Sequence, residues 1–101
     1  MESPKKLSCL LTSIDLQNRK ATVLAELRKY VLEKKELNTG YAYKFSGSDE
    51  MIDLISDFIK SERHCCDFFS FHMHVQNRDA LWLDITGPEG AKEFIKTELE
   101  L

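Results

Sequence analysis

The sequence predicts a small α+β domain, a two-layer sandwich in which helices cover one face of a small sheet. Three observations lead to this prediction. The 101 residues have the length of a single domain, apolar residues recur with helical spacing in three segments, and they alternate in three others. The order along the chain is α-β-α-β-β-α. We expect one domain over residues 1–101 and a sheet of three strands, or of four if a further segment joins it.

The first helix is expected after Thr12 or Asp15, either of which can be its N-cap. Apolar residues then recur at spacings of three and four: Leu16, Val23, Leu24, Leu27, Tyr30 and Val31. Asn38-Thr39-Gly40 is expected to end the helical region, because glycine suits the left-handed position after a helix. Residues 1–6 are expected to be disordered, and residues 7–11 fit either an edge strand or a packed arm.

The first expected strand alternates Tyr41, Tyr43 and Phe45 with smaller or polar residues. A turn and cap over residues 46–49 leads into a second amphipathic helix that is expected to run to about Cys65. Its apolar face is formed by Met51, Ile52, Leu54, Ile55, Phe58 and Ile59.

A hairpin and a final helix complete the expected order. One strand carries Phe69, Phe71, Met73 and Val75, and its partner carries Leu81, Leu83 and Ile85. Residues 87–89 are expected to open the last helix with Pro88 at its first position, and residues 87–90 are interpreted as a cap rather than an anion-binding loop, because Glu89 would repel an anion. The inner face of that helix is expected to hold Ala91, Phe94, Ile95 and Glu98 or Leu99. The opposite sheet face is expected to carry Lys44, His72, His74, Trp82 and Asp84.

Composition excludes several functional classes. The chain is 43% apolar and 31% charged with a net charge of −3, which is typical of a folded globular domain and not of a nucleic-acid-binding protein. No apolar run approaches the roughly 20 residues of a membrane span, and we expect no membrane partner and no signal peptide. Three cysteines, two of them adjacent, favour a reducing cytosol over a secreted disulfide framework.

The second helix carries the candidate chemistry. A step of about 100° per residue places Glu62, Cys65 and Cys66 on its apolar face, if the helix persists that far, and directs His64 away. Thiolates bind zinc, copper(I) and heavier thiophilic ions, and a carboxylate can complete such a site. Alternatively, cysteine packs in cores as a small hydrophobe while Glu62 satisfies a backbone or arginine partner, and this alternative stays open. Dithiol redox chemistry is less favoured, because the cysteines are adjacent rather than spaced Cys-x-x-Cys.

The expected open sheet face is a second candidate. His72 and His74 lie two residues apart on one strand face and could bind a metal ion or join Trp82 in a subunit contact. They lie opposite the inward-facing cysteines, so we do not expect one joint site. A sheet that is covered on one side only predicts a homodimer that buries His72, His74 and Trp82.

Three segments, residues 40–45, 62–71 and 82–94, resemble a family of small, uncharacterised bacterial proteins with a Glu-Arg-x-Cys-Cys-Pro-Phe-x-x-Phe signature. The resemblance runs from about Cys9 onward and implies that Glu62, Cys65 and Cys66 belong to the family motif, with a further cysteine near Cys9. Some members look associated with mercury- or arsenic-resistance contexts, which implies that the thiols meet soft metals. The chain departs from the motif at Asp67, where the family has proline.

Two hypotheses follow. The first is a cytosolic protein in which Cys65, Cys66, Glu62 and Cys9 bind a thiophilic ion, namely zinc, copper(I), mercury or an arsenic species. The second is a structural or protein-interaction module, a homodimer whose cysteines serve only as core packing. The sequence assigns no catalytic residue and names no small-molecule ligand.

Overall fold

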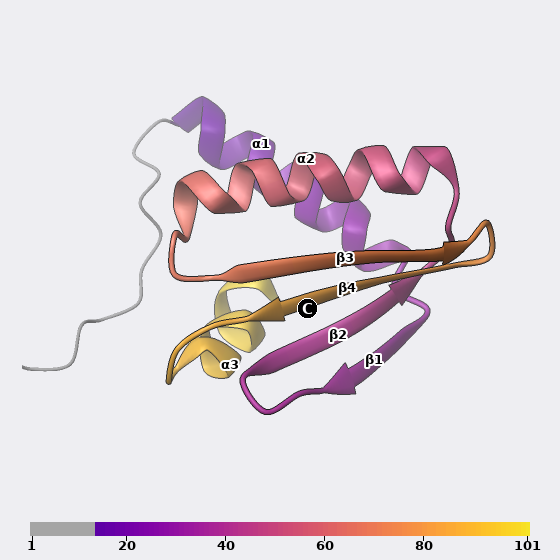
Figure 1. Cartoon of the computed structure of the whole chain (residues 1–101). Coiled ribbons are helices and arrows are strands. Elements are labelled where there is room, and N and C mark those ends of the chain that lie inside the picture. Colours follow the sequence, from indigo (N-terminus) through magenta and orange to yellow (C-terminus); the bar gives the residue numbers. More distant parts are fainter. Residues whose placement is uncertain (1–13) are drawn as a thin grey trace, which may run out of the picture.

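The computed structural model describes residues 14–101, without the side chains of residues 14–17, 19, 20 and 65. Within this range three helical segments and a four-stranded antiparallel sheet form a small α+β fold, which confirms the predicted class (Figure 1). The elements are α1 (Ile14–Lys29), β1 (Glu33–Glu36), β2 (Gly40–Phe45), α2 (Asp49–Cys65), β3 (Ser70–Asn77), β4 (Ala80–Thr86) and α3 (Ala91–Phe94), which continues as a π-helical turn (Ile95–Leu99).

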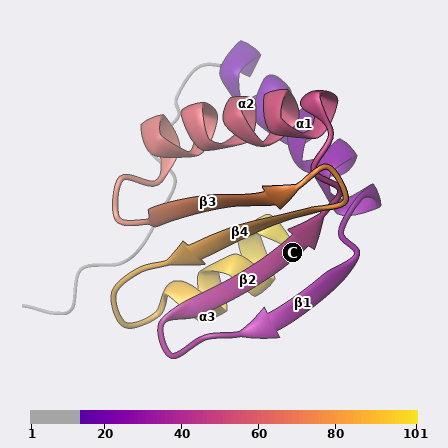
Figure 2. The ribbon, with the colours of Figure 1, turned by 45° about the vertical axis from the view of Figure 1, so that its right-hand side comes forward.

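The sheet has the strand order β1-β2-β4-β3. β4, the last strand in the sequence, is therefore an inner strand of the sheet. Helices α1 and α2 lie along the β3 side, and α3 lies behind β2 and β4 (Figure 2). The register aligns Tyr43 with Leu83 and Leu83 with Met73, so these side chains point to the same face. That face is the helix-covered one, because Tyr43 and Leu83 are fully buried.

One continuous core fills the space between the two layers. Burial confirms the alternation predicted for β2 and β4 and the spacing predicted for α2, whereas on β3 Phe71 and Met73 are partly buried and Val75, predicted to face inward, is exposed. The buried side chains come from every layer: Leu24 and Leu27 of α1, Tyr41, Tyr43 and Phe45 of β2, Met51, Ile55 and Phe58 of α2, Leu81, Leu83 and Ile85 of β4, and Ala91, Phe94, Ile95 and Leu99 near the C-terminus.

The expected element order is corrected at β1, where the structure adds a strand. Helix α1 ends at Lys29, and residues 33–36 pair with β2 instead of continuing a helix. The sequence Glu-Lys-Lys-Glu is exposed throughout and has no apolar alternation, so it gives no strand signal. Charged residues on an edge strand are a common protection against edge-to-edge association. The resulting order is α-β-β-α-β-β-α.

Residues 38–40 therefore turn a hairpin rather than end a helix. The Leu37 amide donates to the Gly40 carbonyl oxygen at 2.8 Å and closes the two-residue turn. A Cβ at Gly40 would lie 1.8 Å from the carbonyl oxygen of Ile85, so glycine is required for the close approach of β4 and not for a left-handed cap.

The start of the last helix is also corrected. Pro88 lies outside α3, which begins at Ala91 after Gly90, whose φ of 94° is in the left-handed region. The Ala91 amide donates to the Pro88 carbonyl oxygen at 3.0 Å, so Pro88 belongs to the preceding turn. Of the two residues expected on the inner face, Glu98 or Leu99, it is Leu99 that is buried, whereas Glu98 is exposed.

Polar contacts hold the C-terminal segment against β1 and α1. Lys92 Nζ lies 2.7 Å from Glu36 Oε2 and keeps the pKa of Glu36 below its ordinary value. Arg28 donates two hydrogen bonds to the Leu99 carbonyl oxygen, and Lys34 donates one to Leu101. These contacts tie the charged edge strand to the rest of the fold.

The expectations for residues 1–6 and 7–11 lie outside the described residues. In the part of the chain that is described, no helix has both the length and the apolar character needed to cross a membrane.

Two neighbouring tyrosines give a test of the core. The Tyr43 hydroxyl is buried with no hydrogen-bond partner among the described residues, and burial raises its pKa. An unsatisfied buried hydroxyl costs about 1–3 kcal/mol, so Tyr43→Phe is expected to leave the free energy of unfolding unchanged or to raise it by up to about 1 kcal/mol in urea titrations. The control is Tyr41→Phe: the Tyr41 hydroxyl has a polar partner, since it raises the pKa of Lys96, so its removal is not expected to stabilise the fold. A clear loss of stability for Tyr43→Phe would contradict the assignment.

Candidate functional site

Helix α2 places Glu62 in the core. Met51, Ile55 and Phe58 precede it at spacings of four and three, and all three are buried. Glu62 continues this line by four residues and is completely inaccessible to solvent, as its position on the apolar face predicts. It is the one buried charged residue in the described part of the chain. Most buried carboxylates are paired, coordinated or neutral, so its position calls for a specific explanation.

Cys66 lies one helical turn after Glu62 and is also completely buried. Its amide donates to the Glu62 carbonyl oxygen at 2.6 Å, which closes the last turn of α2, and its φ of −126° takes the chain out of the helix. The helix therefore ends at the predicted place without the proline of the family motif. The thiol and the carboxylate enter the core from the same end of one helix.

The structure does not describe the side chains of the other two predicted thiol residues, Cys65 and Cys9. Cys65 is the last residue of α2, but its side chain is outside those that the structure describes, and Cys9 lies before residue 14. His64 is exposed, in agreement with its predicted direction. Among the side chains described, no group of three or more His, Cys, Asp or Glu residues could hold a metal ion. The four-residue metal site therefore stays a prediction.

Aromatic rings surround the chain just beyond Cys66. The ring centroids of Phe68 and Phe69 are 4.6 Å apart, and each ring also contacts Phe94 of α3 at 5.2 Å and 5.8 Å. Phe71 joins through Phe69 at 5.9 Å. These rings make the region beyond the helix end apolar, which disfavours an uncompensated charge nearby.

The open sheet face carries the second predicted group. His72 pairs with Asp84 and His74 pairs with Trp82 in the β3–β4 register, so all four side chains lie on the face without helices. The two imidazole centroids are 6.4 Å apart, and His72 Nδ1 lies 3.6 Å from Asp84 Oδ2. As predicted, this face is opposite the one toward which Glu62 and Cys66 are buried.

Lys35 belongs to this face and is absent from the predicted group. Its ammonium group lies 4.7 Å from the centre of the Trp82 ring, within the range of a cation–π contact. Lys35 faces Ala42 across the β1–β2 pair, so it could be placed only after β1 is recognised as a strand. The charged sequence of residues 33–36 gives no signal for that strand.

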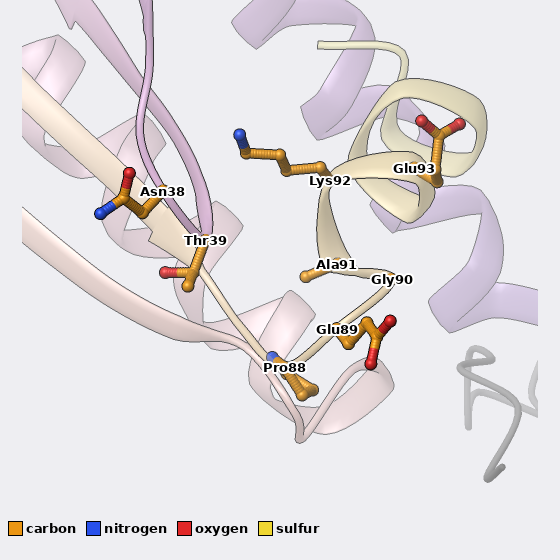
Figure 3. A pocket seen from close by; sticks show the side chains of 8 residues that line it. All are labelled: Asn38, Thr39, Pro88, Glu89, Gly90, Ala91, Lys92 and Glu93. Atoms are coloured by element: carbon orange, nitrogen blue, oxygen red, sulfur yellow. The ribbon is translucent and has the colours of Figure 1, made fainter.

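A shallow pocket of about 220 Å³ lies between the β1–β2 turn and the segment that leads into α3 (Figure 3). Its charged lining residues are Glu89, Lys92 and Glu93, and Lys92 is already paired with Glu36. The acidic lining does not suit an anion. The structure thus agrees with the interpretation of residues 87–90 as a turn and cap.

Comparisons of the chain with models of known families, with curated proteins and with solved structures find no match. The resemblance to the small bacterial family with adjacent cysteines therefore stays a prediction that rests on the motif residues.

The burial of Cys66 predicts its reactivity. In a Cys9→Ser/Cys65→Ser variant Cys66 is the only thiol left, since the chain has three cysteines. We expect slow reaction with a thiol-specific chromogenic reagent under native conditions, because the sulfur is reached only when the end of α2 opens. The same variant in denaturant is the control and is expected to react at once. Prompt reaction of the folded variant would contradict the described position of Cys66.

Proposed function

We propose that this chain is a thiol-based binding protein of a reducing cytosol. In this proposal Cys65 and Cys66 supply thiolates to a thiophilic ion, Glu62 balances the charge or completes the coordination, and Cys9 joins them. The candidate ions are zinc, copper(I), mercury and arsenic species, because thiolate ligands select such ions. The observation that carries the proposal is the complete burial of Glu62 one turn before an equally buried thiol.

Core packing explains the two buried groups unequally. A buried cysteine is common in cores, where it packs as a small hydrophobe, so Cys66 alone fits either hypothesis. A buried glutamate always needs a partner, because removing a carboxylate from water costs several kcal/mol unless it is paired or neutral. A cation bound by thiolates can interact with such a carboxylate. The burial of Glu62 beside a buried thiol is the feature that supports a binding site.

The position at the end of α2 suits metal capture in a further way. Cys65 and Cys66 straddle the point at which the helix stops, so small backbone changes there can adjust the direction of the thiols. The rest of the helix is anchored by Met51, Ile55 and Phe58 in the core. An ion could thus be bound by local adjustment, without unfolding the sheet. The motif resemblance supports the same three residues.

Native mass spectrometry of the full chain tests this proposal. After incubation with zinc, copper(I), arsenite or mercuric ion and removal of excess, we expect one ion retained per chain for at least one of the four. Cys65→Ser, Cys66→Ser and the double variant are expected to lose it, and Glu62→Gln is expected to weaken retention while keeping the side-chain shape. Circular dichroism shows whether each variant is folded.

The matched control is His72→Ala/His74→Ala, which removes two metal-binding groups from the opposite sheet face and is expected to retain the ion. Failure of the wild-type chain to retain any of the four ions would overturn the proposal. So would unchanged retention in a folded Cys65→Ser/Cys66→Ser variant that also carries His72→Ala/His74→Ala.

A second candidate function, a homodimer that acts as an interaction module, is favoured by the open sheet face. Trp82 is only partly buried there, and the rows beside it hold cations, Lys35 and Lys44, and the anions Glu33 and Asp84. A face that carries both signs of charge around a tryptophan can pair with its own copy across a two-fold axis. The cysteines would then serve as packing only.

Sedimentation equilibrium at pH 7.5 and tens of micromolar protein tests the dimer. We expect a mass of two chains for the wild type and a shift toward one chain for Trp82→Ala, because tryptophan is often central to an interface. Tyr30→Ala removes an exposed aromatic side chain just after α1 and is the matched control, with no change expected. A monomeric wild type, or a dimer unaffected by Trp82→Ala, would show that this face is not the interface.

A further inference from the structure

We infer that His72 and His74 form a chelating site for a divalent transition-metal ion of the nickel, copper and zinc class on the open face of the sheet. The site is separate from the proposed thiol site and does not depend on it. Both imidazoles are exposed, and their planes are inclined by only 35° with centroids 6.4 Å apart. Imidazole nitrogen is a ligand that suits all three ions.

The strand geometry brings these two rings together. Residues i and i+2 of a strand project from the same face, so both rings stand on one side of β3. Side-chain rotation of exposed residues takes picoseconds to nanoseconds, so the rings can close on an ion while the backbone stays fixed. The backbone is held there by pairing of both histidines with β4. Because the strand is already formed, less conformational entropy is lost when both imidazoles bind one ion.

Asp84 places a carboxylate beside one ring nitrogen of His72, an arrangement common among metal-binding histidines. Its Oδ2 lies 3.6 Å from His72 Nδ1, and a small rotation of the imidazole would turn this contact into a hydrogen bond. Histidines that ligate metals commonly donate their other ring N–H to a carboxylate, which orients the ring and raises its basicity. With Nδ1 directed to Asp84, Nε2 of His72 is the nitrogen available to the ion. Asp84 is thus a positioning residue.

The site has two protein ligands, and water completes the coordination. The described side chains include no third His, Cys, Asp or Glu residue placed to make a group of three, which agrees with an open and accessible site. The register places Lys44 beside Trp82 on this face, and the ammonium group of Lys35 lies over the Trp82 ring. These cations repel a metal ion on the β1 side of the face, so Asp84 and the histidines on β3 are the favoured place for it.

Trp82 supplies the measurement. It is the only tryptophan of the chain and is the register partner of His74, so a paramagnetic ion bound by the two histidines is expected to quench its fluorescence. We propose titration of the full chain with nickel(II), which prefers nitrogen ligands. Saturable quenching is expected for the wild type and is expected to be lost in His72→Ala and in His74→Ala. Both substitutions are on an exposed face, and thermal unfolding checks that each variant is folded.

His64→Ala is the matched control, because His64 is the only other histidine and is exposed on α2. It is expected to leave the quenching unchanged. Asp84→Asn is expected to weaken nickel binding about tenfold, the lower end of the effect of an outer carboxylate. Glu33→Gln, which removes a carboxylate of the β1 strand on the same face, is expected to leave nickel binding unchanged, which separates orientation of His72 from a general charge effect.

Several outcomes would overturn the inference: no saturable quenching in the wild type, quenching that survives in both His72→Ala and His74→Ala, or loss of quenching in His64→Ala. The Cys65→Ser/Cys66→Ser variant is expected to keep the nickel response. Failure of the thiol proposal and failure of this inference therefore give different results, because one is read from the cysteine variants and the other from the histidine variants.

Discussion

The pairing of β4 with strands on both of its sides is the constraint on which the rest of the structure depends. Its three inward residues, Leu81, Leu83 and Ile85, are completely buried, and each is the register partner of residues on β2 and on β3. A pleated strand points successive side chains to opposite faces of the sheet. This pairing therefore determines which residues of β2 and β3 face the helices and which face the open side. A slip by one residue would expose the core and bury charge.

The same alternation separates the chemistry of the molecule into two parts. The helix-covered face is apolar and encloses Glu62 and Cys66, whereas the open face carries imidazole, indole, ammonium and carboxylate groups. Ligands on the first face would be shielded from water and would have to compensate a buried charge. Ligands on the second would exchange freely with solvent. The two proposed sites thus differ in their donor atoms and in their access to solvent.

One buried charge and one run of exposed charges mark the regions of interest. Glu62 lies inside the core at the end of α2, and four consecutive charged residues form β1 at the sheet edge. The second has a structural explanation, since an exposed edge benefits from charge and Lys92 and Lys34 link it to the C-terminal segment. Glu62 is the charged group that the core encloses, close in the chain to the equally buried Cys66.

The sequence by itself determined the α+β class, the inner faces of β2, α2 and β4, and the burial of Glu62, because apolar periodicity reports burial directly. It also separated His72 and His74 from the cysteines through the two-residue repeat of a strand. Only the tertiary structure decided β1, because four charged residues carry no periodic signal and their strand exists only through hydrogen bonds to β2. In the same way, the role of Gly40 follows from the approach of β4, and the contacts of Lys35 with Trp82 and of Asp84 with His72 follow from register, which pairs residues far apart in the chain.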